Sequence, residues 1–144
     1  MKADAIKRFV LDASVTLAWC FPEERAKYPD AVLDLLSRGA EAAAPAIWPF
    51  EVANALLAGE RRQRMTVAQV TSMLSRITRL PISVDPVHTV HAFNQILPLA
   101  RQSRLTQYDA SYLELALRLS LPLATLDVQL QRAAKDAGLP LLRI

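Results

Sequence analysis

Arg8-Phe9-Val10-Leu11-Asp12-Ala13-Ser14 is the stretch that decides the fold, because three apolar residues in it run directly into a carboxylate. A continuous apolar run is typical of a parallel strand that is buried on both faces. In open α/β sheets, ligands bind outside the carboxyl ends of the strands. Asp12 is therefore either a helix cap or part of a functional site, and this stretch alone leaves both interpretations open.

The composition is that of an ordinary globular chain. Its 144 residues are 52% hydrophobic and 22% charged, which predicts a single domain over residues 1–144 with a sizeable core. The lone Cys20 excludes an intramolecular disulfide, and Asp12 interrupts the only apolar stretch that resembles a secretory signal. No window holds the roughly 18 uncharged apolar residues that a membrane helix requires. We therefore expect a cytoplasmic protein without a membrane span.

The net charge is mildly positive. The chain has 17 Lys and Arg against 14 Asp and Glu, a formal charge of +3. This balance alone does not imply a nucleic-acid partner. If several acids are gathered in one pocket, however, the remaining surface is more basic, and a polyanionic partner becomes more plausible.

Strand-like and helix-like segments alternate along the chain. After the first strand, short apolar runs bounded by turn residues predict strands at 42–45, 81–85, 122–127 and 139–144. Apolar residues at helical spacing predict helices near 14–20, 29–38, 47–57, 67–77, 88–101, 110–119 and 128–137, with Pro98 bending or fraying the end of its helix. The predicted fold class is therefore α/β, with a central parallel sheet of about five short strands and helices on both faces.

Four carboxylates stand near predicted helix N-termini, namely Asp12, Glu51, Asp109 and Asp127. Helix capping, or a favourable interaction with the helix dipole, explains any one of them. Thr106, three residues before Asp109, even fits the capping-box pattern. Capping is thus the structural alternative to a functional site for each acid taken alone.

Two of these acids lack a local cationic partner. Asp109 shares a helical face with the apolar residues Tyr112 and Leu113, so we expect it to point inward. Glu51 likewise has no Lys or Arg on the neighbouring turns of its helix. Because an unpaired buried charge is expensive, both acids need a partner that the nearby sequence does not supply.

The other two acids, Asp12 and Asp127, each end a predicted strand. In a parallel sheet the two therefore lie on the same edge. If all four acids converge there, mutual repulsion calls for a cation among them. Hard oxygen ligands without Cys or His nearby favour Mg²⁺ or Mn²⁺, so the spacing is compatible with a divalent-metal site.

Four segments together resemble the PIN-domain family and, more narrowly, the VapC-type toxin ribonucleases of type II toxin–antitoxin pairs. They are Asp12-Ala13-Ser14, Glu51-Val52-Ala53-Asn54, Tyr108-Asp109-Ala110-Ser111-Tyr112 and Thr125-Leu126-Asp127. Each segment alone is a weak signal, but four in register are specific. The resemblance covers essentially the whole chain, apart from the short extension at 1–7 that precedes the first strand.

The resemblance implies a metal-dependent endoribonuclease. The implied site consists of the core metal ligands Asp12 and Asp109, the acids Glu51 and Asp127 that complete the catalytic cluster, and the supporting residues Ser14 and Asn54. Ser14 could instead be a helix-start hydroxyl, and Asn54 could be purely structural. One or two Mg²⁺ or Mn²⁺ ions would activate a water that attacks an RNA phosphodiester, leaving a 5′-phosphate and a 3′-hydroxyl.

The implied partners are RNA, a cognate antitoxin protein and a second copy of the chain, in a homodimer and in a toxin–antitoxin hetero-oligomer. One alternative from another class is a catalytically silent PIN-fold RNA-binding or scaffold protein, which typically lacks one or more of the acids. A second is a phosphatase of the haloacid dehalogenase type. That chemistry requires a second Asp two residues after the first, and Ser14 occupies this position.

Overall fold

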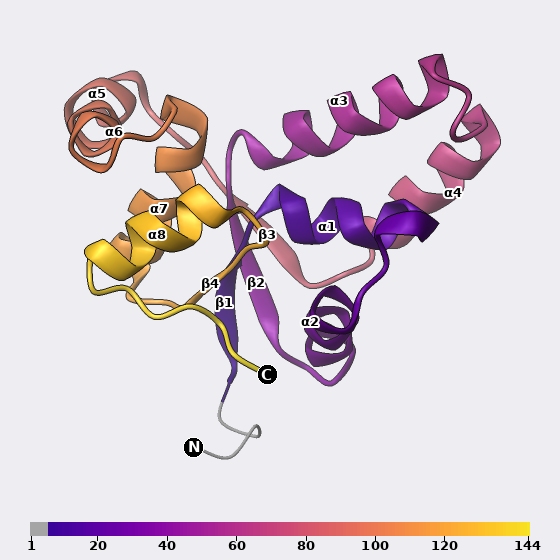
Figure 1. Ribbon diagram of the computed structural model, residues 1–144, viewed down its shortest axis with the longest axis horizontal. Helices are drawn as coiled ribbons and strands as arrows, with labels where there is room; N and C mark the ends of the chain where they lie inside the picture. The colour runs from indigo at the N-terminus through magenta and orange to yellow at the C-terminus, as the bar shows by residue number, and fades with distance from the viewer. Residues whose placement is uncertain (1–5) are drawn as a thin grey trace.

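A parallel sheet of four short strands runs through the middle of the molecule, in the order β3-β2-β1-β4 (Figure 1). The computed structural model describes residues 6–144, so most of the expected extension at 1–7 lies outside the described residues. The strands are β1 (Arg8–Leu11), β2 (Glu41–Pro45), β3 (Ile82–Asp85) and β4 (Leu123–Ala124). The predicted α/β class with a parallel sheet is confirmed.

The central position of β1 explains its apolar run. Phe9, Val10 and Leu11 are each 0% exposed, because helices cover both faces of the sheet at this strand. Val10 pairs with Ala43 on one side and with Leu123 on the other. The consecutive apolar residues thus indicate two-sided burial, as the sequence predicts.

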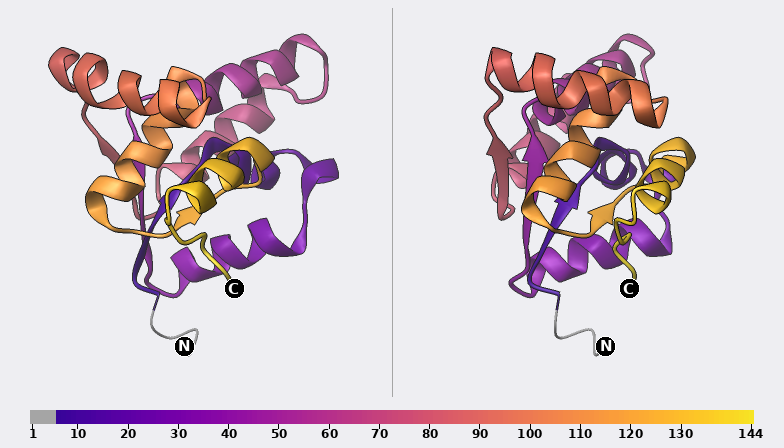
Figure 2. Two further views of the ribbon diagram at one scale, coloured as in Figure 1. Left: turned by 60° about the vertical axis from the view of Figure 1, so that its left-hand side comes forward. Right: turned by 90° about the vertical axis from the view of Figure 1, so that its left-hand side faces the viewer.

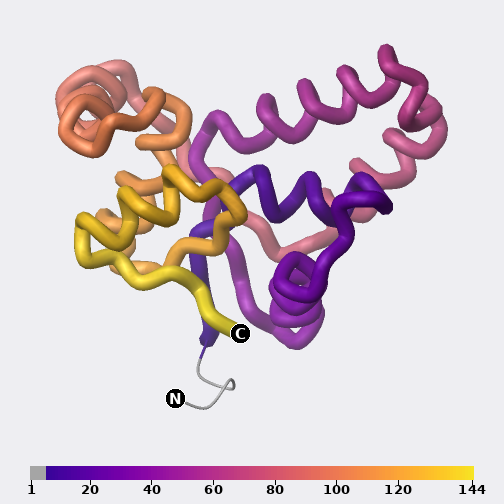
Figure 3. Tube along the Cα trace, viewed as in Figure 1, coloured from indigo at the N-terminus to yellow at the C-terminus, as the bar shows by residue number. Residues whose placement is uncertain are grey.

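Helices α1 (Ala13–Cys20) and α2 (Lys27–Ser37) cover one face of the sheet, with a short 3-10 turn, η2 (Pro22–Glu24), between them. Helix α3 (Trp48–Arg61) then leaves the end of β2, and α4 (Val67–Ile77) brings the chain back towards β3 (Figure 3). Thr66 and Gln69 form a complete capping box at the start of α4. The predicted start of this helix is therefore confirmed. The capping box supplies hydrogen-bond partners to two backbone N–H groups that the helix itself leaves unpaired.

The opposite face is covered by the second half of the chain. It contains α5 (Thr89–His91), the π-helical turn η3 (Ala92–Ile96), α6 (Leu97–Ser103), α7 (Gln107–Leu119) and α8 (Val128–Asp136). The long helix α7 packs on β1, β2 and β4, while α8 lies beside the β4 edge (Figure 2). The helix predicted at 88–101, with a bend or frayed end at Pro98, exists as α5, η3 and α6 and continues to Ser103. The irregular turn precedes the proline, which has no N–H for a regular helical hydrogen bond.

The predicted fifth strand at 139–144 is wrong. This tail forms only one isolated bridge, between Leu141 and Leu123, although Leu142 also donates its N–H to the Leu123 carbonyl. Two features limit the pairing: β4 is only two residues long, and Pro140 has no N–H to donate. The described residues therefore hold four strands where the sequence predicts about five.

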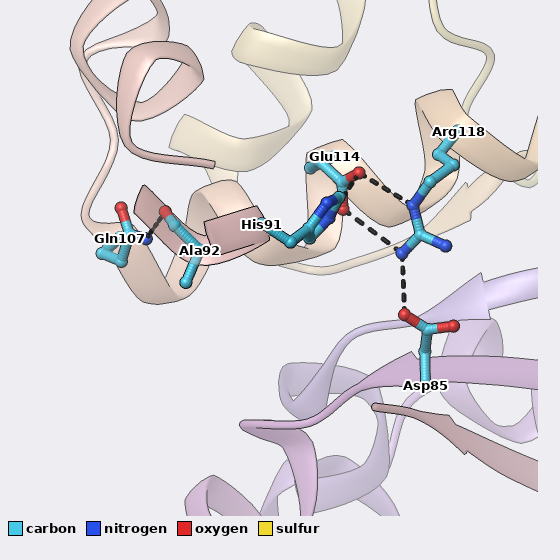
Figure 4. A network of polar contacts seen from close by, with 6 residues as sticks. All are labelled: Asp85, His91, Ala92, Gln107, Glu114 and Arg118. Atoms are coloured by element: carbon cyan, nitrogen blue, oxygen red, sulfur yellow. Dashed lines mark hydrogen bonds and ion pairs between the residues drawn. The ribbon is translucent and has the colours of Figure 1, made fainter. Parts of the chain in front are cut away.

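A polar network joins α5 and the end of β3 to α7 (Figure 4). Arg118 forms ion pairs with Glu114 at 2.8 Å and with Asp85 at 2.7 Å. His91 approaches the same Glu114 carboxylate at 2.9 Å. The network holds α7 in place on the side of the sheet where β2 and β3 end. No helix in the described range is long and apolar enough to cross a membrane.

Candidate metal centre

Asp12 follows β1 directly and is almost completely buried, with 5% of its surface exposed. It occupies the N-cap position of α1, but its side chain makes no capping hydrogen bond. Its Oδ2 atom instead accepts hydrogen bonds from Ser14 Oγ at 2.5 Å and from Thr125 Oγ1 at 2.8 Å. The capping interpretation is therefore wrong for Asp12, and the expected support from Ser14 is present.

Thr125 connects the ends of the two neighbouring strands β1 and β4. Besides donating to Asp12, its buried hydroxyl accepts the backbone N–H of Asp127 at 3.0 Å. Ser14 Oγ similarly accepts the N–H of Leu126 at 3.0 Å. In the sequence interpretation, Thr125 is part of the segment Thr125-Leu126-Asp127 but has no role of its own. The signal for such a role was its position two residues before Asp127, on a strand expected to end at the same edge as Asp12.

Glu51 lies in the first turn of α3 and is half-buried. The start of this helix is attached to α1, because Trp48 donates its indole N–H to Thr16 Oγ1 at 3.0 Å. Glu51 Oε1 accepts the hydroxyl of Tyr112 on α7 at 2.6 Å. Asn54, one turn later on α3, is exposed and makes no side-chain hydrogen bond among residues 6–144. Glu51 is thus turned towards α7, whereas Asn54 faces solvent.

The remaining two acids lie at the starts of α7 and α8. Thr106 caps α7 by accepting the N–H of Asp109, so the Asp109 carboxylate is not used as the cap. Asp127 is the N-cap of α8, and its Oδ1 accepts the Leu130 N–H at 2.9 Å. The capping interpretation is correct for Asp127. Its Oδ2 makes no hydrogen bond within the described part of the chain, so capping occupies only one of the two oxygens.

The negative charges of the acids act on one another's pKa values. Burial raises the pKa of Asp12, and the negative charge of Asp127 raises it further. The pKa of Glu51 is raised by burial and then by Asp12 and Asp109. Burial, Asp127 and Asp12 likewise raise the pKa of Asp109. None of the four acids forms an ion pair within residues 6–144, so their mutual repulsion is uncompensated there.

The chemistry of this donor set fits a divalent cation. The donors are carboxylate oxygens, which are the ligands that Mg²⁺ and Mn²⁺ prefer. They come from four different elements of the fold. Among residues 6–144, no three Asp, Glu, His or Cys side chains lie close enough together to hold a metal ion. Water molecules commonly complete the coordination of Mg²⁺, so the acids need not supply every ligand.

The fold defines a class: a small α/β protein in which the acids Asp12 and Asp127 follow the neighbouring parallel strands β1 and β4. The family model for the PIN domain matches residues 9–136. Ribonuclease VapC3 from Pyrobaculum aerophilum is 30% identical over 127 residues, which span 85% of this chain and 92% of that protein. The chain belongs to the PIN-domain family, and within it to the VapC-type proteins.

Solved structures share the fold. The protein PAE2754 from Pyrobaculum aerophilum superposes with a TM-score of 0.69 at 23% identity, covering 92% of this chain and 87% of that one. VapBC2 from Rickettsia felis, bound to a DNA fragment from its promoter, gives a TM-score of 0.65 at 14% identity, with coverage of 94% and 97%. At these identities the likeness concerns the fold alone.

Proposed function

We propose that this chain is a metal-dependent endoribonuclease and the toxin component of a type II toxin–antitoxin pair. The observation that supports this most strongly is that four carboxylates from four different elements influence one another electrostatically, while none of them pairs with a cationic side chain among residues 6–144. In this proposal Asp12, Glu51, Asp109 and Asp127 hold one or two Mg²⁺ or Mn²⁺ ions. The similarity to a protein named as a ribonuclease supports the same conclusion.

A bound divalent ion would acidify a water and stabilise the charge that develops on the scissile phosphate. The protein's own contribution is to orient these carboxylates through hydrogen bonds. Ser14 and Thr125 donate to the same oxygen of Asp12, which orients the carboxylate that would help to hold the ion. Asp127 is oriented by its capping bond to Leu130.

The proposed partners follow from the family. RNA of the cytoplasm is the proposed substrate, and the net positive charge of +3 suits a polyanion. The VapBC2 structure from Rickettsia felis contains a VapB and VapC pair, which supports a cognate antitoxin for this chain. We further propose that residues 1–144 act as one domain that forms a homodimer and a toxin–antitoxin hetero-oligomer.

The decisive experiment compares cleavage of structured RNAs by the wild type and by Asp109→Asn, with Mn²⁺ or with EDTA. We expect cleavage by the wild type in Mn²⁺ and a loss of at least about 100-fold in the variant, beyond the effect typical of outer-shell residues. Asp34→Asn is the matched control, because Asp34 is an exposed acid on α2 that pairs only with Arg38. It should cleave as the wild type does.

Three outcomes would contradict the proposal. The first is equal cleavage by Asp109→Asn, and the second is cleavage that EDTA does not diminish. The third is RNA that binds without being cut by any variant in Mn²⁺, which would favour the silent RNA-binding alternative.

A further inference from the structure

The phenol of Tyr112 is a buried polar group to which the proposed site assigns no role. Tyr112 is 0% exposed and lies on α7, one turn after Asp109. Its hydroxyl donates to Glu51 Oε1 at 2.6 Å, within the short range typical of O–H bonds to a carboxylate. The contact joins α7 to the first turn of α3 across 61 positions of sequence.

The Tyr112 hydroxyl acts as a hydrogen-bond donor to Glu51. Burial raises the pKa of the Tyr112 phenol, and the neighbouring Glu51 and Asp12 charges raise it further. The hydroxyl is thus the donor in this bond, and the Glu51 carboxylate is the acceptor.

Within the described range, the Glu51 carboxylate has a single hydrogen-bond donor, and that donor comes from another helix. Asp12 has two hydroxyl donors, and Asp127 has its capping bond. Tyr112 is the only hydrogen-bond donor to the Glu51 side chain within residues 6–144. Glutamate also has more rotatable bonds than aspartate, so without that donor its carboxylate would sample more positions.

We propose that Tyr112 is a positioning residue that fixes Glu51 within the acid cluster, an inference that rests on the proposed metal-dependent function. Helix α7 then sets two members of the cluster at once. It carries Asp109 in its first turn, and it orients Glu51 through the phenol one turn later. The ring of Tyr112 packs in the core, and its hydroxyl performs the positioning.

The test is Mn²⁺ affinity, measured by calorimetric titration of the protein without RNA. Tyr112→Phe keeps the ring and removes only the hydroxyl, so we expect affinity to fall about tenfold, as for other outer-shell partners. Tyr28→Phe is the matched control. The Tyr28 hydroxyl is partly buried and donates to the Leu142 carbonyl at 2.8 Å. That variant should bind Mn²⁺ as the wild type does.

A double-substitution cycle separates positioning from a general loss of structure. If Tyr112 acts through Glu51, adding Tyr112→Phe to Glu51→Ala should produce no further loss of Mn²⁺ affinity. Wild-type affinity in Tyr112→Phe would overturn the inference. The same tenfold loss in the Glu51→Ala background would overturn it as well, because the hydroxyl would then act on something other than Glu51.

A second measurement keeps the inference testable if Tyr112→Phe does not fold. The chain has three tyrosines, so NMR of protein labelled at the tyrosine Cζ carbon gives three signals, assigned with Tyr28→Phe and Tyr108→Phe. Mg²⁺ should move the Tyr112 signal in the wild type but not in Glu51→Ala. A Tyr112 signal that Mg²⁺ leaves in place contradicts the inference.

Different results would contradict the metal-dependent function and the role of Tyr112. If the wild type binds no Mn²⁺, both the metal-dependent function and the role of Tyr112 are wrong. If the wild type binds Mn²⁺, Asp109→Asn weakens that binding and Tyr112→Phe does not, only the role of Tyr112 is wrong.

Discussion

Thr125 donates its hydroxyl to the Asp12 carboxylate at 2.8 Å, across 113 positions of sequence. The contact exists because β1 and β4 are parallel neighbours in which Leu11 pairs with Ala124. The residues that follow both strands therefore emerge side by side. One buried hydroxyl thereby orients Asp12 and, by accepting the N–H of Asp127, also sets the start of α8.

Removing this hydroxyl should weaken the proposed metal site. We expect Thr125→Val to reduce Mn²⁺ affinity and RNA cleavage about tenfold or more, because Asp12 loses one of its two donors. The Asp127 N–H also loses its acceptor, so the free energy of unfolding should fall by about 1–2 kcal/mol. Thr125→Ser keeps the hydroxyl and should restore most of the affinity. Titration and urea denaturation measure the two effects, and wild-type affinity in Thr125→Val would contradict the role of Thr125.

Repulsion among the acids should make the metal-free protein sensitive to pH. The pKa values of Asp12, Glu51 and Asp109 are raised above the ordinary 3.8 for Asp and 4.5 for Glu. In the window just above those values, the folded chain binds more protons than the unfolded chain. The contribution of these groups to the free energy of unfolding therefore falls as the pH rises through that window.

Asp109→Asn removes one of these charges and should raise the metal-free Tm at neutral pH, as measured by scanning calorimetry. Asp34→Asn should leave Tm unchanged, because an exposed pair contributes little. A lower Tm in Asp109→Asn would show that repulsion among the acids is not the dominant effect.

Divalent metal should stabilise the folded protein by neutralising the same repulsion. At a Mn²⁺ concentration 100 times the Kd, binding to the folded state adds about 2.7 kcal/mol to the free energy of unfolding. We expect Mn²⁺ to raise Tm, EDTA to reverse the change, and Asp109→Asn to lose most of it. A Tm that responds equally to Mn²⁺ in both proteins would place the metal elsewhere.

The network around Arg118 should contribute to stability and not to metal binding. Arg118→Met leaves Glu114, which is 12% exposed, without its main cationic partner, and it also releases Asp85 at the end of β3. We expect the free energy of unfolding to fall by about 1–2 kcal/mol, with unchanged Mn²⁺ affinity. Arg38→Met breaks an exposed pair on α2 and should cost less than about 0.5 kcal/mol. Equal losses in the two variants would indicate that the network adds nothing beyond a surface pair.

Gly59 should tolerate alanine poorly although it lies inside α3. Alanine normally stabilises a helix interior relative to glycine. Here a Cβ would lie 3.0 Å from Cε1 of the buried Phe21 ring, whose face is also covered by the Arg64 guanidinium. We expect Gly59→Ala to lower the free energy of unfolding by about 1 kcal/mol, as overpacking usually does. In a Phe21→Leu background the penalty should vanish, and stabilisation by Gly59→Ala in the unaltered chain would contradict the predicted clash.

Local patterns in the sequence were sufficient for much of the fold. The apolar run before Asp12 predicted a central parallel strand, and Thr66 predicted the start of α4. The prediction that Asp127 caps the following helix was also correct. Each of these features depends on residues within a few positions of one another, where backbone geometry and hydrogen bonding are set by neighbours in the chain.

Contacts between distant residues were decided only by the tertiary structure. The sequence interpretation identified four acids but could not place Glu51 or Asp109 relative to Asp12, because helix orientation depends on packing against the whole sheet. It also predicted a fifth strand at 139–144 that the two-residue β4 and Pro140 do not support. The hydrogen bonds of Thr125 to Asp12 and of Tyr112 to Glu51 join residues that only the folded chain brings together. The residue types determined which chemistry was available, whereas long-range packing determined which oxygen each donor reaches.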